Sequence, residues 1–147
     1  MEYTTIKLAI YGNPQVEIEG VPNSGIRPGA ICLQRNDSFY EQALGVAGES
    51  FEKLVAIEDL HLGNDIDYVY EPGGRVTLIN LRPGDKFLGI LEPAQTAKIG
   101  DTLELSTTNA GMLTVVVGAT DPGLVIGKVC KSVISTIGSV YIEVSVI

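Results

Sequence analysis

The chain has 147 residues, the length of one ordinary domain, of which 45% are hydrophobic and 19% are charged. Its 18 acidic and 10 basic residues give a formal net charge of −8, which argues against a nucleic-acid binder and against docking on an anionic membrane surface. No apolar run approaches the roughly 18 residues of a membrane span, and the first residues lack the features of a signal peptide. We therefore expect a protein that is made in a cytoplasm.

The first 25 residues are predicted to form an extended arm. Ile6, Leu8 and Ile10 alternate with smaller or polar residues, as in a half-buried strand, and loops with glycine and proline follow. Such an arm either completes the chain's own sheet or pairs with an edge strand of another subunit, and the sequence leaves both alternatives open. We predict partner or subunit contacts at Tyr3, Ile6, Leu8, Ile10 and Tyr11.

Denser strand signals begin after residue 26. Strands are predicted at 31–34, from about 39, and at 53–57, with turns between them. The segment 45–52 is predicted to be irregular or to form a single helical turn.

The most acidic segment covers residues 58–71. The spacing from Asn64 to Asp67 faintly matches a calcium-binding loop, but the glycine at the sharp turn and the closing glutamate of such a loop are missing. We expect a solvated acidic loop, with a weak calcium site as the alternative. No metal site is predicted elsewhere.

From residue 70 to residue 113, short β-branched runs alternate with tight turns. The runs predict strands at 76–79, 87–91 and 102–105. Pro72-Gly73 and Pro83-Gly84 suit the central positions of type II turns. Gly-Asp pairs precede two of the strands, and we expect Asp85 and Asp101 to bond their own backbone there.

The C-terminal part supplies further strand signals at 115–117, 124–133 and 139–147. Gly127 lies inside one of these runs and predicts a bulge or a close backbone crossing. In total the sequence predicts nine or ten strands and at most one short helix. Turn signals at this spacing are typical of an all-β barrel or sandwich.

The residues offer little for catalysis or cofactor binding. Cys32 and Cys130 are read as small buried thiols, and His61 is the only histidine. Asp85, Glu92 and Asp101 are candidates for a hydrolytic pair, but the chain has only six Tyr and three Phe to line a cleft. We predict that the protein is not an enzyme and has no cofactor.

An ordered series of motifs resembles the capsid decoration (cement) proteins of tailed bacteriophages, over about residues 25–147. The motifs are Leu54–Asp59, Gly63–Asp67, Tyr70–Val76, Arg82–Asp85, Ile99–Leu103 and Ala110–Leu113. Gly74 stands where the family usually carries an acid before Arg75, so a salt bridge is not assumed there. Residues 1–25 match nothing in the family.

This resemblance implies a single compact β-barrel or sandwich-like (β-tulip-like) domain at residues 26–147, with the extended arm at 1–25. It implies homotrimers at three-fold and quasi-three-fold positions on the outer surface of the virion, with the major capsid protein as partner. There the protein would stabilise the expanded shell against internal DNA pressure. Neither nucleic acid nor membrane is expected as a partner.

Two alternatives come from other classes. A non-catalytic β-barrel binding module, carrier-like or glycan-binding, shares the rhythm of Gly-Asp turns and strands, but the chain lacks the exposed lysine of a carrier hairpin and an aromatic cluster for sugar. A hydrolase on an all-β scaffold is the other alternative.

Overall fold

The computed structural model describes residues 3, 5–9, 17–36, 39–46, 48, 52–118, 121–135 and 137–147. These residues form strands β1 to β13 and one short 3-10 helix, η1 (Leu60–Leu62). The prediction of an all-β fold is confirmed, and the described residues contain no more than this one short helix. Residues 47 and 49–51 of the segment 45–52 lie outside the described residues, so an irregular segment or a single helical turn there stays a prediction. Within the described residues, no helix is long and apolar enough to cross a membrane.

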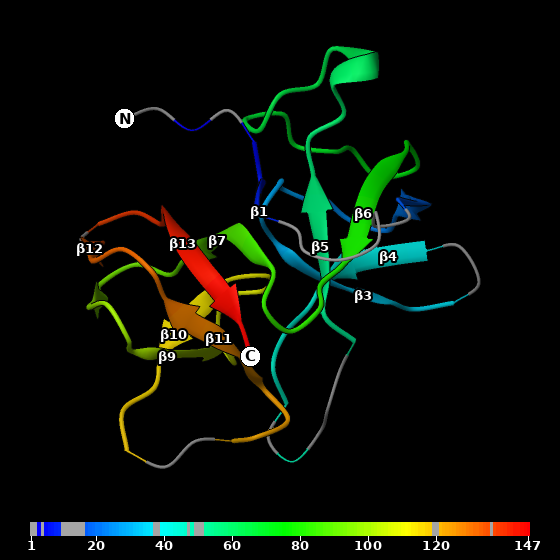
Figure 1. Cartoon of the computed structure of the whole chain (residues 1–147). Coiled ribbons are helices and arrows are strands. Elements are labelled where there is room, and N and C mark those ends of the chain that lie inside the picture. The colour runs from blue at the N-terminus through cyan, green and yellow to red at the C-terminus, as the bar shows by residue number, and fades with distance from the viewer. Residues whose placement is uncertain are drawn as a thin grey trace.

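Five strands close into a first ring, in the order β2-β4-β3-β5-β6. The antiparallel pairing of β2 with β6 closes this barrel. Of the pairings among these five strands, that of β2 with β4 is parallel and the others are antiparallel. The strands are β2 (Ile18–Pro22), β3 (Ile31–Gln34), β4 (Phe39–Gln42), β5 (Leu54–Ile57) and β6 (Val76–Asn80). They lie on the right in Figure 1.

The remaining long strands form a second ring. The sheet order is β1-β7-β10-β9-β11-β13, and an additional pairing of β13 with β7 closes β7, β10, β9, β11 and β13 into a ring. β1 pairs with β7 and lies outside this closed ring. The strands are β1 (Lys7–Ala9), β7 (Lys86–Leu91), β9 (Thr102–Leu105), β10 (Leu113–Val115), β11 (Val125–Val129) and β13 (Val140–Val146). A separate two-stranded ribbon pairs β8 (Thr96–Ala97) with β12 (Val133–Ile134).

The alternation of side chains along β5 explains how the two rings share a core. Leu54 and Ala56 belong to a buried cluster made only of first-ring residues and their flanking loops. Val55 and Ile57 point to the other face and pack in a second cluster, which also contains the interior of the second ring. All four side chains are buried, and each large one contributes about 1.5–3 kcal/mol through burial.

Backbone hydrogen bonds also join the rings. The Ile31 amide donates to the Gly111 carbonyl (3.0 Å), and the Gly111 amide donates to the Ala43 carbonyl (2.6 Å). Gly111 has a φ of 77°, and a Cβ there would lie 2.9 Å from the Ala30 Cβ. The close approach of the rings therefore depends on a residue without a side chain.

Two local predictions are confirmed. The pairing of β11 with β9 shifts register between Val125 and Gly127, so the bulge is present, and a Cβ on Gly127 would lie 2.1 Å from the Ser145 carbonyl oxygen of β13. The carboxylates of Asp85 and Asp101 accept hydrogen bonds from the amides of Arg82 and Lys98, each at 2.9 Å. These acids are turn residues, as expected.

The strand predicted at 115–117 is displaced. The structure places β10 at Leu113–Val115, because Leu113 pairs with Leu105 of β9 and with Leu91 of β7. Val117 lies beyond the strand and is 92% exposed. The run of valines indicated a strand, but pairing of buried leucines on two neighbouring strands set its position.

Candidate functional site

The carboxylates considered for hydrolysis are held in separate structural roles. Asp85 is buried in its turn, and Asp101 bonds the Lys98 amide. Glu92 Oε2 accepts hydrogen bonds from Ser106 Oγ (2.6 Å) and Asn109 Nδ2 (2.8 Å). In the part of the chain that the structure describes, no three His, Cys, Asp or Glu side chains are grouped to hold a metal ion.

The environment of Glu92 favours its charged form. Burial by itself raises the pKa of this carboxyl, but the hydrogen bonds from Ser106, Asn109 and Thr114 outweigh burial and lower the pKa below its ordinary value. A carboxylate that is stabilised in this way fixes the loop after β9 to the end of β7. It is unsuited to act as a general acid.

The acidic segment from 58 to 71 divides into two parts. Asp65 and Asp67 are exposed, as a solvated loop requires. Glu58 is buried instead, because its carboxylate accepts hydrogen bonds from Thr5 Oγ1 and from the Ile6 amide (3.0 Å). The expectation of a solvated loop is therefore wrong for Glu58, which binds the N-terminal segment.

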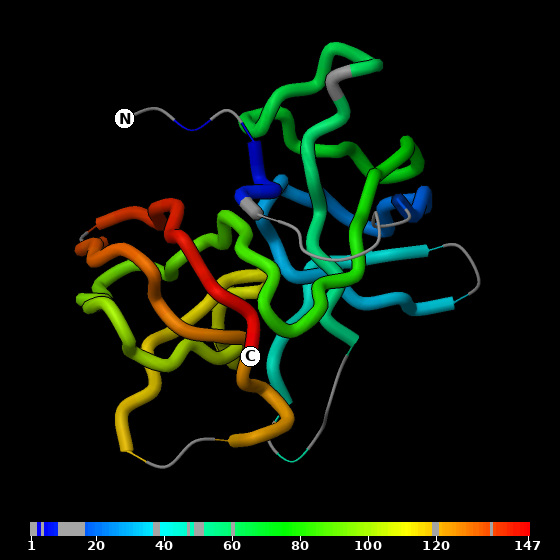
Figure 2. The backbone as a smooth tube through the Cα atoms, in the orientation of Figure 1, coloured from blue at the N-terminus to red at the C-terminus, as the bar shows by residue number. Residues whose placement is uncertain are grey.

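The N-terminal segment lies between the two rings (Figure 2). β1 pairs antiparallel with β7, and the Leu88 amide donates to the Ile6 carbonyl (2.8 Å). Tyr3 Oη donates to Glu143 Oε2 of β13 (3.0 Å), and burial, this bond and the Glu143 charge all raise the pKa of Tyr3. Since Glu58 follows β5 of the first ring, the segment connects both rings.

The structure places three of the five predicted contact residues. Ile6 is fully buried, and Tyr3 and Leu8 are half-buried against the shared core. Ile10 and Tyr11 lie outside the described residues. Contact of these five with a partner stays a prediction, and so does the division of the chain at residue 25. In this conformation the Ile6 side chain is occupied within its own chain.

A second connection between the rings is built on Arg27. Its guanidinium carbon lies 4.9 Å from the ring centroid of Tyr141, and its Nη1 donates to Ser139 Oγ (2.9 Å). Tyr141 Oη donates to the carbonyls of Pro28 (3.2 Å) and Ile66 (3.0 Å). Sequence patterns did not indicate this cluster, because its members come from three distant segments.

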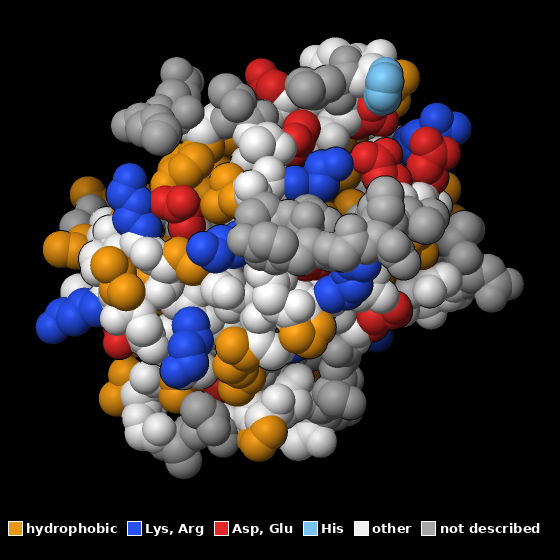
Figure 3. Space-filling view, in the orientation of Figure 1, with side chains coloured by type: hydrophobic (Ala, Val, Ile, Leu, Met, Phe, Trp, Pro, Cys, Tyr) orange, Lys and Arg blue, Asp and Glu red, His pale blue; other side chains and the backbone are white. Residues whose placement is uncertain are grey.

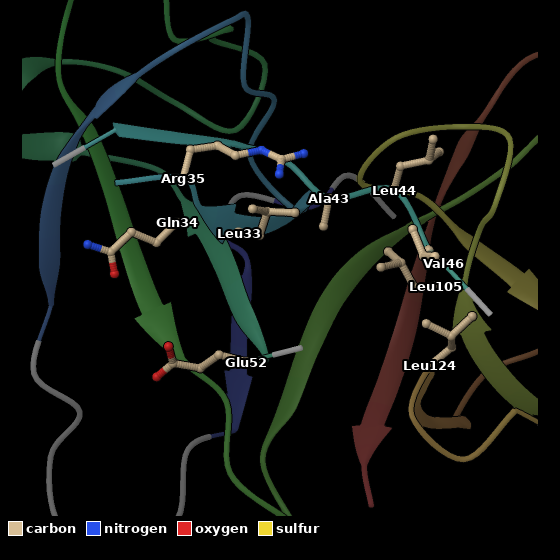
Figure 4. A pocket seen from close by; sticks show the side chains of 10 residues that line it. Leu33, Gln34, Arg35, Ala43, Leu44, Val46, Glu52, Leu105 and Leu124 are labelled. Carbon is tan, nitrogen blue, oxygen red and sulfur yellow. The ribbon is translucent and has the colours of Figure 1, made fainter. Parts of the chain in front are cut away.

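A groove of about 420 Å³ opens where the rings meet on another side (Figure 4). Leu33, Ala43 and Leu44 line it from the first ring, and Leu105 and Leu124 line it from the second. Arg35 and Glu52 stand at its polar edge. Among the described residues, the lining combines aliphatic side chains with Gln34, Arg35 and Glu52 and contains no aromatic side chain on which a sugar would stack.

Two exposed apolar patches lie at the outer parts of the molecule. The ribbon patch consists of Ile99, Ile134 and Ile137 with Lys98 and Lys131, on and beside the β8–β12 ribbon. The loop patch consists of Leu62, Tyr68 and Val69 with Asp65 and Asp67, in the connection from β5 to β6.

Figure 3 shows orange and blue side chains, with a red one close by, at the edge where Figure 1 places β12, and it shows several red side chains, with blue ones among them, at the upper end of the molecule. Exposed apolar clusters of this kind mark interaction surfaces.

The fold of two fused β-rings occurs in a protein of a phage head. The chain is similar to the crystal structure of the N base of head fiber gp8.5 in bacteriophage phi29, with a TM-score of 0.58 and 10% identity. The similarity covers 91% of this chain and 95% of that chain. At this identity the likeness concerns the fold alone. No family model and no curated protein sequence matches the chain.

Proposed function

We propose that the chain is a non-enzymatic decoration protein of a tailed-phage capsid, which binds the outer surface of the head and stabilises the expanded shell. The observation that carries this proposal is the shared fold with the phi29 head fiber base over 91% of this chain. The resemblance of its motif series to phage decoration proteins supports the same class from the sequence. The two lines of support are independent, because the structural neighbour is only 10% identical.

The construction of the molecule suits such a role. The two rings share one buried cluster, exchange backbone hydrogen bonds and are both bonded to the N-terminal segment. A body joined in this way transmits force between attachment points without needing a reactive centre. Trimers at three-fold and quasi-three-fold positions would bind the major capsid protein through several weak contacts, since attachment of one subunit makes the next contact effectively intramolecular.

The groove between the rings is the feature to weigh against the alternative function, a carrier or glycan-binding module. The aliphatic side chains that both rings contribute to it and its position beside the backbone bonds between the rings fit a gap between two packed barrels. We therefore keep capsid decoration as the proposed function.

Cosedimentation with shells of the parent phage tests the proposal. Purified protein is mixed with expanded and with unexpanded shells, and bound protein is measured after centrifugation. We expect saturable binding to expanded shells, weaker binding to unexpanded ones, and a higher dissociation temperature of decorated shells. Absence of binding to expanded shells, or equal stability of bare and decorated shells, would contradict it.

A further inference from the structure

The ribbon patch is an exposed apolar surface on a firmly held support. Ile99, Ile134 and Ile137 are 70%, 64% and 96% exposed. The ribbon beneath them is anchored by the buried Ser135, whose Oγ donates to the Glu92 carbonyl (2.6 Å) and accepts from the Gln95 amide (3.1 Å). The Ile99 amide also donates to Ser132 Oγ (3.0 Å), and Ile134 pairs with Thr96 in the ribbon, so these two isoleucines are exposed on hydrogen-bonded structure.

The charge around the ribbon patch is opposite to that of the whole chain. Segments 93–100 and 129–137 contain Lys98 and Lys131 but no acidic residue, in a protein with a net charge of −8. Neither lysine forms an ion pair with a carboxylate that the structure describes. Two acids lie beside these segments: the Asp101 carboxylate accepts from the Lys98 amide (2.9 Å), and Glu143, which accepts from Tyr3 Oη, lines the same hollow as Lys131.

The loop patch has the complementary character. Leu62, Tyr68 and Val69 are exposed, and Asp65 and Asp67 lie among them. Across the described ranges, neither aspartate is part of an ion pair. The loop is also held in place, since Tyr141 Oη donates to the Ile66 carbonyl and the Tyr70 amide donates to the Ile26 carbonyl (2.8 Å).

We propose that the ribbon patch of one copy of this chain binds the loop patch of a second copy. The two patches occupy separate places on one molecule, at the left and at the top of Figure 1. Each combines exposed apolar side chains with charged residues of one sign that form no ion pair within the described part of the chain. Contact between copies covers the apolar side chains of both patches and sets Lys98 and Lys131 opposite Asp65 and Asp67. Opposite potentials of this kind determine orientation and reject the pairing of like patches.

A second copy is the occupant that the chain itself supports, because both halves of the interface are present in one sequence. A contact between unlike patches repeats from copy to copy and closes a ring where the rotation permits. The inference rests on the oligomer in the proposed function and specifies its interface, but it does not depend on binding to a shell. The two are therefore tested separately.

The test measures self-association of the full chain by native mass spectrometry and analytical ultracentrifugation, without shells. One double variant is K98E/K131E in the ribbon patch, and the other is D65K/D67K in the loop patch. Each alone is expected to weaken self-association by about tenfold or more, because like charges then face each other. An equimolar mixture of the two is expected to recover association in part, since contacts between the two different variants are complementary again, whereas a three-membered ring keeps one contact between copies of the same variant.

Two further variants control for folding and for net charge. K86E/K128E makes the same charge change at exposed lysines of β7 and β11, outside both patches, and is expected to leave association unchanged. Ile137→Glu places a charge at a side chain that is 96% exposed, and is expected to weaken association without lowering the melting temperature.

A wild-type chain that stays monomeric at high micromolar concentration would overturn the inference. So would a mixture of the two reversed variants that does not associate more strongly than either alone. If K98E/K131E keeps the wild-type oligomer but loses binding to expanded shells, the ribbon patch faces the capsid, which overturns the contact between copies and leaves the proposed function standing. Normal self-association through the patches without binding to shells would support the contact between copies and contradict the proposed function.

Discussion

The two rings differ in how much of their buried interior is supplied by residues from outside the ring. The first ring encloses a cluster of its own, formed by Ile26, Cys32, Tyr40, Leu54, Ala56, Tyr70, Val76 and Leu78. The interior of the second ring belongs to a larger cluster that also contains Ile6, Val55, Ile57 and Ile79, from the N-terminal segment and the outer face of the first ring. The first ring therefore has a buried interior of its own, whereas the buried interior of the second ring includes residues from outside that ring.

The net charge is also divided unevenly between the part of the chain that contains the first ring and the part that contains most of the second. Residues 1–85 contain 13 acidic and six basic residues, whereas residues 86–147 contain five acidic and four basic residues. Almost all of the net charge of −8 therefore belongs to the part with the first ring. The near-neutral second part carries the ribbon patch, so unlike surfaces are presented from the two parts of the chain.

Gly127→Ala should have the largest effect and should act first on the second ring. The new Cβ would lie 2.1 Å from the Ser145 carbonyl oxygen, and strand backbone cannot yield as a flexible side chain does. We expect a loss of about 4 kcal/mol or more in the free energy of unfolding, measured by urea denaturation. Amide hydrogen exchange should increase in β11 and β13 before it increases in β5.

Gly138→Ala is the matched control, since nothing lies within 4 Å of a Cβ at that position. We expect a change within about 0.5 kcal/mol. Equal destabilisation by the two substitutions would contradict the role of the bulge. Equal loss of amide protection in both rings of Gly127→Ala would show that the first ring has no independent stability.

Ile6→Ala tests the dependence of the second ring on the N-terminal segment. Ile6 is fully buried in the shared cluster, so truncation should cost about 3 kcal/mol, within the usual range for such core substitutions. Val117→Ala, at a side chain that is 92% exposed, should cost almost nothing. If Ile6→Ala were equally mild, the segment would not be part of the core, and all five predicted arm contacts would be free for a partner.

Glu92→Gln should have the smallest effect and should depend on pH. The folded pKa of Glu92 is lowered from its ordinary value of 4.5, so its contribution is present above the unfolded pKa and is lost as the pH falls through the lowered folded pKa. At neutral pH we expect the variant to be less stable, on the order of 1 kcal/mol.

Thermal unfolding from pH 7 to pH 3 of both proteins measures the effect. The difference in melting temperature should shrink below pH 4.5. A difference that is constant with pH would mean that the charge of Glu92 does not contribute.

The sequence predicted local structure well, because its signals are local. The strands at 31–34 and 102–105 are confirmed residue for residue, and so are the Gly-Asp turns and the bulge at Gly127. The grouping of strands into two rings was not predictable in this way. Leu54 and Val55 are both apolar, and nothing in the sequence tells which of them faces which core.

The candidate surfaces were harder to predict than the strands. Alternation at Ile6 and Leu8 indicated a strand, but it did not tell whether the partner strand belongs to the same chain. The buried Glu58 that binds this segment lies more than fifty residues away, within a stretch that read as solvated. The ribbon patch was also missed, because β8 and β12 are two residues each and pair over a long separation.

The pairing of β7 with β1 on one edge and with β13 along its length has a consequence for synthesis. The first ring has all its strands once Asn80 has left the ribosome, whereas the second must wait for residues after Val140. During translation, β7 therefore emerges with β1 as the one partner already made. The finished barrel next to it offers the nascent strand an apolar surface, which limits the time during which β7 is open to pairing with other chains.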